Sequence, residues 1–170
     1  MRHAILKGLV ASLLIAAVAS VDAATATNTF QVTATVLKFC TVSATNLAFG
    51  NYTPSTGAVT NSSTVTYACT NGTPITSITL NIGTTAGATF GQRLMTNGTQ
   101  TLQYNLYTTN AYSSIWGDGT GGSVTQAGVT GAGLGTNDTL TVYGKLPDSA
   151  ANQAIPPGSY NDTITVTVNY

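Results

Sequence analysis

Apolar and polar side chains alternate along residues 24–36, which read ATATNTFQVTATV. Apolar residues occupy every second position from Ala24 to Val36, with Asn28 as the one exception, and the positions between them are Thr or Gln. Alternation with a period of two places one set of side chains on one face of an extended chain. The segment therefore predicts a β-strand about 40 Å long with one apolar face.

The same alternation recurs in short runs along the rest of the chain, and Gly, Asn, Pro and Ser separate the runs. The predicted strands cover residues 32–42, 47–49, 64–69, 75–82, 93–95, 101–107, 140–146 and 164–170. The dipeptides Asn71-Gly72 and Asn97-Gly98 are typical of tight turns between strands. Many short strands with turn signals between them predict an all-β Greek-key sandwich.

The beginning of the chain has the organisation of a secretory signal peptide. Positive charges in the first seven residues precede an uncharged apolar run over residues 8–19, which is too short to span a membrane. Small side chains three residues and one residue before the predicted cut place cleavage after Ala23. We expect residues 1–23 to be removed and the mature chain to be exported as one domain, over residues 37–170, without stable membrane insertion.

The two cysteines of the chain are Cys40 and Cys69. An even number of cysteines in an oxidising compartment favours a disulfide, and two buried thiols are the alternative. The bond would close a loop of about 30 residues and would leave residues 24–36 outside that loop.

Charged residues make up only 6% of the chain, the formal net charge is zero and there is no Glu. The absence of a basic patch argues against nucleic acid as a partner. Because the one His lies within the predicted signal peptide, the mature chain lacks the base of Ser-His-Asp and Cys-His sites and a common zinc ligand. We therefore expect neither an enzyme nor a metal or cofactor site.

Two local patterns resemble binding motifs, but we favour simple structural roles for both. Gly117, Gly119 and Gly122 match G-x-G-x-x-G, but no helix pattern follows them, so we expect a surface loop with Trp116 as its packing anchor. Asp118 and Asp138 are too scattered for the several carboxylates of a typical calcium site, and capping of turns is the simpler role.

Four stretches in the C-terminal half carry a resemblance to a known family. They are LQYNLY at residues 102–107, WGDGTGG at residues 116–122, VYGKL at residues 142–146 and PGSYNDT at residues 157–163. In this order, before a terminal alternating strand and with a first cysteine about 17 residues into the mature chain, they resemble the spore coat protein U domain. That domain is the pilin subunit of archaic, Csu-type chaperone–usher pili of Gram-negative bacteria.

The resemblance implies an incomplete immunoglobulin-like Greek-key sandwich that lacks its last strand and therefore has a hydrophobic groove. In this family a periplasmic pilus chaperone fills the groove first, and an outer-membrane usher then replaces the chaperone with the N-terminal strand of another identical or related pilin subunit. This exchange is donor-strand complementation, a form of β-strand addition. We expect a structural subunit of a cell-surface fimbrium, in a shaft or adaptor position, that serves surface attachment and biofilm formation.

The resemblance also implies roles for two sets of residues. The donor strand, over residues 24–36, would insert the side chains of Ala26, Asn28, Phe30, Val32 and Ala34 into a neighbouring groove. One wall of the chain's own groove would consist of Ile164, Val166, Val168 and Tyr170. The small Ala and polar Asn positions depart from a bulky aliphatic donor pattern and leave the register open.

Two other functions are compatible with the sequence. In a closed monomeric sandwich, residues 24–36 would be an ordinary first strand, and the protein would be a secreted module that binds carbohydrate or a surface. Its candidate aromatic patch is Trp116 with Tyr112 and Tyr107. A structural coat protein of a spore or fruiting body is the other alternative, with the same fold and the same polymer chemistry.

Overall fold

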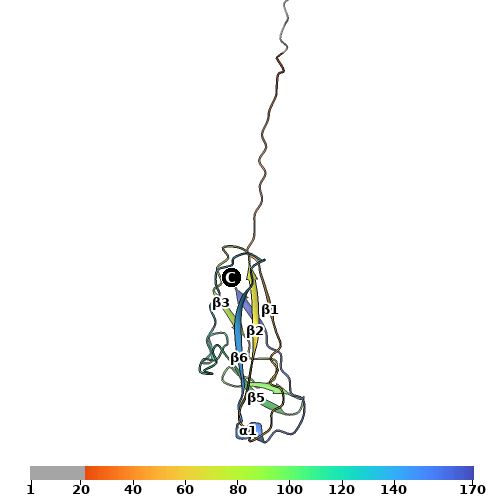
Figure 1. Cartoon of the computed structure of the whole chain (residues 1–170), viewed down its shortest axis with the longest axis vertical. Helices are drawn as coiled ribbons and strands as arrows, with labels where there is room; N and C mark the ends of the chain where they lie inside the picture. Colours follow the sequence, from red (N-terminus) through yellow and green to blue (C-terminus); the bar gives the residue numbers. More distant parts are fainter. Residues whose placement is uncertain (1–21) are drawn as a thin grey trace, which may run out of the picture. The chain divides into compact units, whose positions relative to one another are not determined.

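The computed structural model describes residues 22–170, so the predicted signal peptide over residues 1–23 lies almost entirely outside the described residues. The chain divides into two units, Met1–Thr35 and Val36–Tyr170. In the described part of the first unit, residues 22–35 contain no helix or strand. The regular structure of the described residues lies in the second unit, which is a β-sandwich (Figure 1).

Within residues 22–170 the second unit contains seven strands and one short helix. They are β1 (Cys40–Ala44), β2 (Val59–Cys69), β3 (Ser77–Leu80), β4 (Arg93–Thr96), β5 (Thr101–Tyr107), β6 (Asp138–Leu146), α1 (Ala150–Gln153) and β7 (Val166–Asn169). One sheet has the order β1-β2-β6-β5-β4 and the other pairs β3 with β7, and every pairing is antiparallel. Among residues 22–170, no helix is long and apolar enough to span a membrane.

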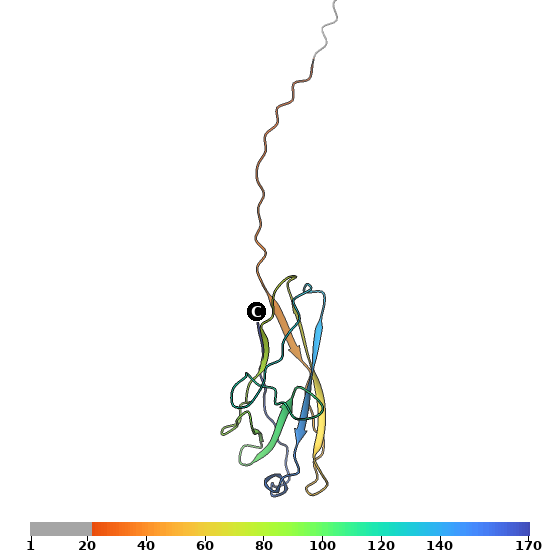
Figure 2. The same ribbon diagram turned by 90° about the vertical axis from the view of Figure 1, so that its left-hand side faces the viewer.

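The strand order is that of an immunoglobulin-like sandwich with one strand missing. Strands β1, β2, β6 and β5 take the places of A, B, E and D, while β3 and β7 take those of C and F. Strand G, which pairs with F in such domains, has no counterpart among the described residues. The predicted all-β immunoglobulin-like class is confirmed, and one edge of β7 faces the edge strand β1 of the other sheet without pairing to it (Figure 2).

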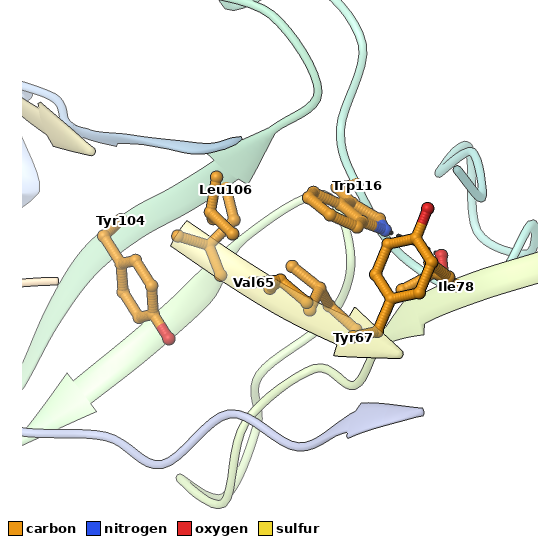
Figure 3. Close-up of a cluster of buried hydrophobic side chains, with 8 residues drawn as sticks. Val65, Tyr67, Ile78, Tyr104, Leu106 and Trp116 are labelled. Carbon is orange, nitrogen blue, oxygen red and sulfur yellow. Dashed lines mark hydrogen bonds between the residues drawn. The ribbon is translucent and has the colours of Figure 1, made fainter. Parts of the chain in front are cut away.

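The hydrophobic core lies between the two sheets (Figure 3). Its buried members are Val65, Tyr67, Ile78, Leu80, Tyr104, Leu106, Trp116 and Val142. Trp116 is fully buried, its indole Nε1 donates a hydrogen bond to the carbonyl of Ile78 at 2.9 Å, and its backbone N–H donates to the carbonyl of Leu106 at 2.9 Å. Trp116 therefore links β3 to β5 through its indole and its backbone, and its predicted role as a packing anchor is confirmed.

The glycine-rich segment after Trp116 is a loop, as predicted. Asp118 accepts hydrogen bonds from the backbone N–H and the hydroxyl of Thr120, at 2.8 Å and 2.7 Å. Gly119 and Gly122 have φ values of +91° and +80°, which only glycine adopts without strain. This geometry is that of a tight turn with a capping aspartate.

A disulfide joins Cys40 to Cys69, which lie directly opposite each other in the ladder between β1 and β2. The predicted pairing is confirmed. Because Cys40 is the first residue of β1 and Cys69 the last residue of β2, the covalent link fixes the beginning of the edge strand to the end of its neighbour.

Several predicted strands differ from those observed. The prediction for residues 101–107 matches β5, whereas that for residues 32–42 was too long, because only Cys40–Ala44 is a strand, and residues 47–49 form none. The strand predicted over residues 24–36 is also not formed. A strand exists only through hydrogen bonds to a neighbour, and β2, the partner of β1, ends at Cys69.

Reduction of the disulfide should destabilise the fold by about 3.5 kcal/mol, since the bond removes the entropy of a loop of about 30 residues from the unfolded chain. Urea unfolding of the oxidised protein, compared with that of a Cys40→Ser, Cys69→Ser variant, measures this difference. Equal midpoints for the two proteins, with equal slopes, would contradict it.

Candidate functional site: an open apolar groove

A groove with a volume of about 1050 Å³ opens onto the hydrophobic core. Its first wall consists of residues 44–52, which continue β1, and its second wall consists of residues 155–164 and Val166, which lead into β7. The floor is made of core side chains from both sheets, namely Val65, Leu80, Leu102, Tyr104, Leu106, Val142 and Leu146. The groove thus lies where strand G of a complete immunoglobulin-like domain would cover the core.

The first wall packs on a glycine of the central strand β6. A Cβ at Gly144 would lie 2.7 Å from Cδ1 of Leu47 and 3.0 Å from Cζ of Phe49, so only glycine leaves room for both side chains. Phe49 also packs edge-on against Tyr104, with 6.0 Å between the ring centroids. The backbone N–H of Thr45 donates to the carbonyl of Thr64 at 2.9 Å and so extends the pairing of β1.

Asp162 anchors the second wall to two other parts of the sandwich. Its Oδ2 accepts a hydrogen bond from the hydroxyl of Tyr104 on β5 at 2.7 Å. Its Oδ1 accepts hydrogen bonds from the backbone N–H and the hydroxyl of Thr84, at 2.8 Å and 3.1 Å. Burial, with the hydrogen bond to Asp162, raises the pKa of Tyr104, so the hydroxyl remains a donor at every physiological pH.

Asn81 continues this anchoring one step nearer to β7. Its backbone N–H donates to the carbonyl of Thr165 at 3.1 Å, and its side-chain oxygen accepts from the N–H of Thr165 at 2.9 Å. The carbonyl of Asn81 is occupied by Arg93, whose Nε and Nη2 donate to it at 3.0 Å and 2.8 Å.

Arg93 is fully buried, and its guanidinium also donates to Asn105 Oδ1 at 2.8 Å and to the carbonyl of Trp116 at 2.7 Å. Desolvation lowers the pKa of Arg93 to about 10, which still leaves it charged at neutral pH. A buried cation is tolerated only when its donors are satisfied, and here Nε and both terminal nitrogens have acceptors.

A second carboxylate holds the loop that leaves the first wall. Asp148 accepts hydrogen bonds from the hydroxyl of Tyr52 and from the backbone N–H groups of Ser55 and Gly57, the latter two at 3.0 Å and 2.9 Å. The hydrogen bond from Tyr52 is the main cause that lowers the pKa of Asp148 to about 2. Burial and the same hydrogen bond raise the pKa of Tyr52 to about 12.

The residues predicted for the groove wall take different places. Ile164 and Val166 line the groove, Val168 packs against the core, and all three are half-buried. Tyr170 is 49% exposed and does not line the groove.

The residues predicted for the donor strand are exposed in the described chain. They are Ala26, Asn28, Phe30, Val32 and Ala34, of which Phe30 and Val32 are 88% and 82% exposed. The roles of both predicted sets remain predictions.

Sequence reasoning assigned no role to the first wall or to Asp162. The alternation of Leu47 and Phe49 was the available signal for the wall. Nothing local marks Asp162 as the partner of Tyr104, because the two residues are 58 positions apart.

The alternative aromatic patch is not an exposed surface. Trp116 is fully buried, and the half-buried Tyr107 and Tyr112 pack on each other edge-on, with 5.5 Å between their centroids. Residues 22–170 contain no group of three His, Cys, Asp or Glu side chains placed to hold a metal ion.

Comparisons with known proteins place this groove in context. The sequence profile of the Spore Coat Protein U domain matches residues 26–167. A chain in the crystal structure of the CsuC–CsuE chaperone–tip adhesion subunit pre-assembly complex, from archaic chaperone–usher Csu pili of Acinetobacter baumannii, has a similar fold, with a TM-score of 0.51 and 23% identity. The match covers 80% of this chain and 41% of that chain, and no curated protein sequence matched.

Gly83→Ala should destabilise the protein more than Gly98→Ala. Both glycines have nearly the same φ, +96° and +95°, so each substitution incurs roughly 1 to 2 kcal/mol of backbone strain. A Cβ at Gly83 would additionally lie 2.7 Å from Cγ of Asp162, whereas a Cβ at Gly98 meets nothing within 4 Å. Thermal unfolding of the two variants measures the difference, and equal losses would show that Asp162 is not fixed beside Gly83.

Asp148→Asn should weaken the pH dependence of stability in acid. Because the pKa of Asp148 is lowered from 3.8 to about 2 in the folded state, its contribution is present above about pH 4 and disappears as the pH falls through about 2. The free energy of unfolding should therefore fall less steeply between these pH values in the variant than in the wild type. Tyr52→Phe should reduce the slope in the same direction, and unchanged slopes in both variants would contradict the assignment.

Proposed function

We propose, since the chain belongs to the Spore Coat Protein U domain family, that it is a structural subunit of an extracellular fibre assembled by a chaperone–usher pathway. Residues 24–36, the donor segment, of one subunit would fill the groove of another subunit as the missing strand. The observation that carries this proposal is the groove itself, because it opens over core side chains at the position of strand G.

The groove offers what an added strand needs. The outer edge of β7 and the edge strand β1 both have backbone groups without a partner strand among the described residues. An unprotected edge of this kind pairs readily with another chain, and main-chain hydrogen bonds give such added strands much of their affinity.

The donor segment has complementary properties. Its alternating pattern presents one apolar face, and the large side chains of Phe30 and Val32 are exposed in the described chain. Each Å² of apolar surface that enters the groove contributes about 25 cal/mol, and the core side chains of the floor are covered at the same time. The gain comes mainly from the donor side chains, because the floor side chains are already buried in the described chain.

The proposed partners follow from this assembly. They are identical or related subunits, a periplasmic chaperone that covers the groove before assembly and an outer-membrane usher that exchanges the chaperone for a donor segment. The fibre would be displayed at the cell surface and would serve attachment and biofilm formation. Apolar side chains dominate the groove floor, which suits an added strand with one apolar face.

The monomeric binding module is less favoured, because Trp116, the largest member of its candidate patch, is fully buried. A coat protein would use the same strand addition and differs only in where the fibre or layer is deposited.

Phe30→Asp should abolish multimers of the exported protein that survive denaturant, because it places a charge in an apolar groove. Gln31→Asp is the matched control, since Gln31 lies on the opposite, polar face of the donor segment. The measurement is gel mobility of unboiled and boiled samples, with a chain lacking residues 24–34 as a further variant. Multimers that persist in Phe30→Asp and in the deletion, or a wild type that is only monomeric, would overturn the proposed function.

A further inference from the structure

We propose that Asp162, Tyr104, Thr84 and Asn81 form a polar clamp that holds the second wall of the groove in the position that accepts a donor segment. This inference rests on the proposed function and assigns Tyr104 and Asp162 as positioning residues for strand acceptance.

The second wall needs such a clamp because the regular ladder ends before the wall is complete. Strand β7 begins at Val166, and the last backbone pair that continues its ladder joins Asn81 to Thr165. At this pair the carbonyl of Asn81 is turned to Arg93, and the side-chain oxygen of Asn81 accepts the N–H of Thr165 instead. From Thr165 toward the N-terminus, hydrogen bonds from side chains replace part of the backbone ladder in holding the second wall.

Asp162 is the centre of the clamp. Its two oxygens accept from β5 through Tyr104 at 2.7 Å, and from the segment after β3 through Thr84 at 2.8 Å and 3.1 Å. One residue away, Asn161 exchanges backbone hydrogen bonds with Thr96 at the end of β4, at 2.8 Å and 3.0 Å. The wall is therefore fixed to β5, to β4 and to the end of β3, while its opposite edge remains without a partner strand in the described chain.

The clamp and the groove share two residues. Tyr104 and Asp162 both line the groove, so the hydrogen bond between them spans from its floor to its second wall. In Figure 3 Tyr104 lies at the opposite end of the labelled cluster from Ile78 and Tyr67. The ring therefore packs in the core while the hydroxyl sets the distance between floor and wall.

This geometry predicts that loss of the clamp slows the capture of a donor segment, and that this effect is separate from any loss of stability of the domain. A wall held in place before the donor segment arrives needs no further ordering when the strand is added, and preorganisation of this kind increases the rate and strength of association. Without the hydroxyl of Tyr104 the core packing of the ring persists, but the wall loses its link to β5. The capture of a donor segment should then be slower, even at temperatures where the domain remains folded.

Tyr107→Phe provides a matched control for Tyr104→Phe. Both tyrosines lie on β5, but the hydroxyl of Tyr107 makes no hydrogen bond within residues 22–170. The two substitutions thus remove the same atom from the same strand, and only one of them breaks the clamp.

The experiment uses the full mature chain with Phe30→Asp, so that its own donor segment does not compete. The probe is a fluorescent synthetic peptide with the sequence of residues 24–36, and the capture rate is followed by anisotropy. We expect Tyr104→Phe to slow capture about tenfold, which corresponds to about 1.4 kcal/mol, and Tyr107→Phe to leave the rate unchanged. Near-ultraviolet circular dichroism verifies that each variant is folded at the temperature of the measurement.

The outcomes separate this inference from the proposed function. If the parent chain captures no peptide, the proposed function fails, and the clamp fails with it. If the parent and Tyr104→Phe capture the peptide at equal rates, the clamp is overturned while the proposed function stands, even when Tyr104→Phe melts at a lower temperature. Asp162→Asn, which keeps one acceptor oxygen, should be slowed less than Asp162→Leu.

Discussion

The outer edge of β7 has no partner strand within the described chain, and the rest of the structure depends on this one unmet pairing. In a complete immunoglobulin-like domain, strand G would cover the core and would hold both flanking edges. Here a groove of about 1050 Å³ opens over the core, and its two walls have to be held by other means. The packing of Leu47 and Phe49 on Gly144 holds the first wall, and Asp162 fixes the second. A fold of this kind is stable enough to persist but keeps one face that gains from an additional strand.

The buried Arg93 explains how side chains can substitute for a strand. Its guanidinium donates to the carbonyls of Asn81 and Trp116 and to the side chain of Asn105, so one residue of β4 links the segment after β3, the segment after β5 and β5 itself. A buried charge is costly unless it is fully satisfied, and a satisfied polar network is rigid because each bond constrains its neighbours. Rigidity beneath the groove is of direct value to a surface that has to remain open.

The sequence predicts the parts of this fold that depend on local pattern and fails on the parts that depend on distant partners. Residues 101–107 carry both the alternation and a preceding turn dipeptide, and β5 has those bounds. The helix α1 was not predicted, since it spans only Ala150–Gln153 and no periodicity shows in four residues. The strand over residues 24–36 has the clearest pattern of all but lacks a partner, and a pattern alone supplies no hydrogen bonds. Tyr104 and Asp162 are 58 positions apart, so no local sequence pattern predicts the hydrogen bond between them.

Under the proposed function, the same constraint favours a second copy over the same chain as the source of the missing strand. A donor segment that entered its own groove would have to reverse direction between residue 36 and Cys40. The intervening residues Leu37-Lys38-Phe39 include no Gly, Pro, Asn or Asp, the residue types that form tight reversals. Phe39 is moreover held beside Thr70, whose N–H donates to the carbonyl of Phe39 at 2.9 Å and whose hydroxyl accepts the N–H of Phe39 at 3.2 Å. Under the proposed function, groove and donor segment are each satisfied by a different neighbour, and a head-to-tail contact that does not close on itself would produce an open fibre.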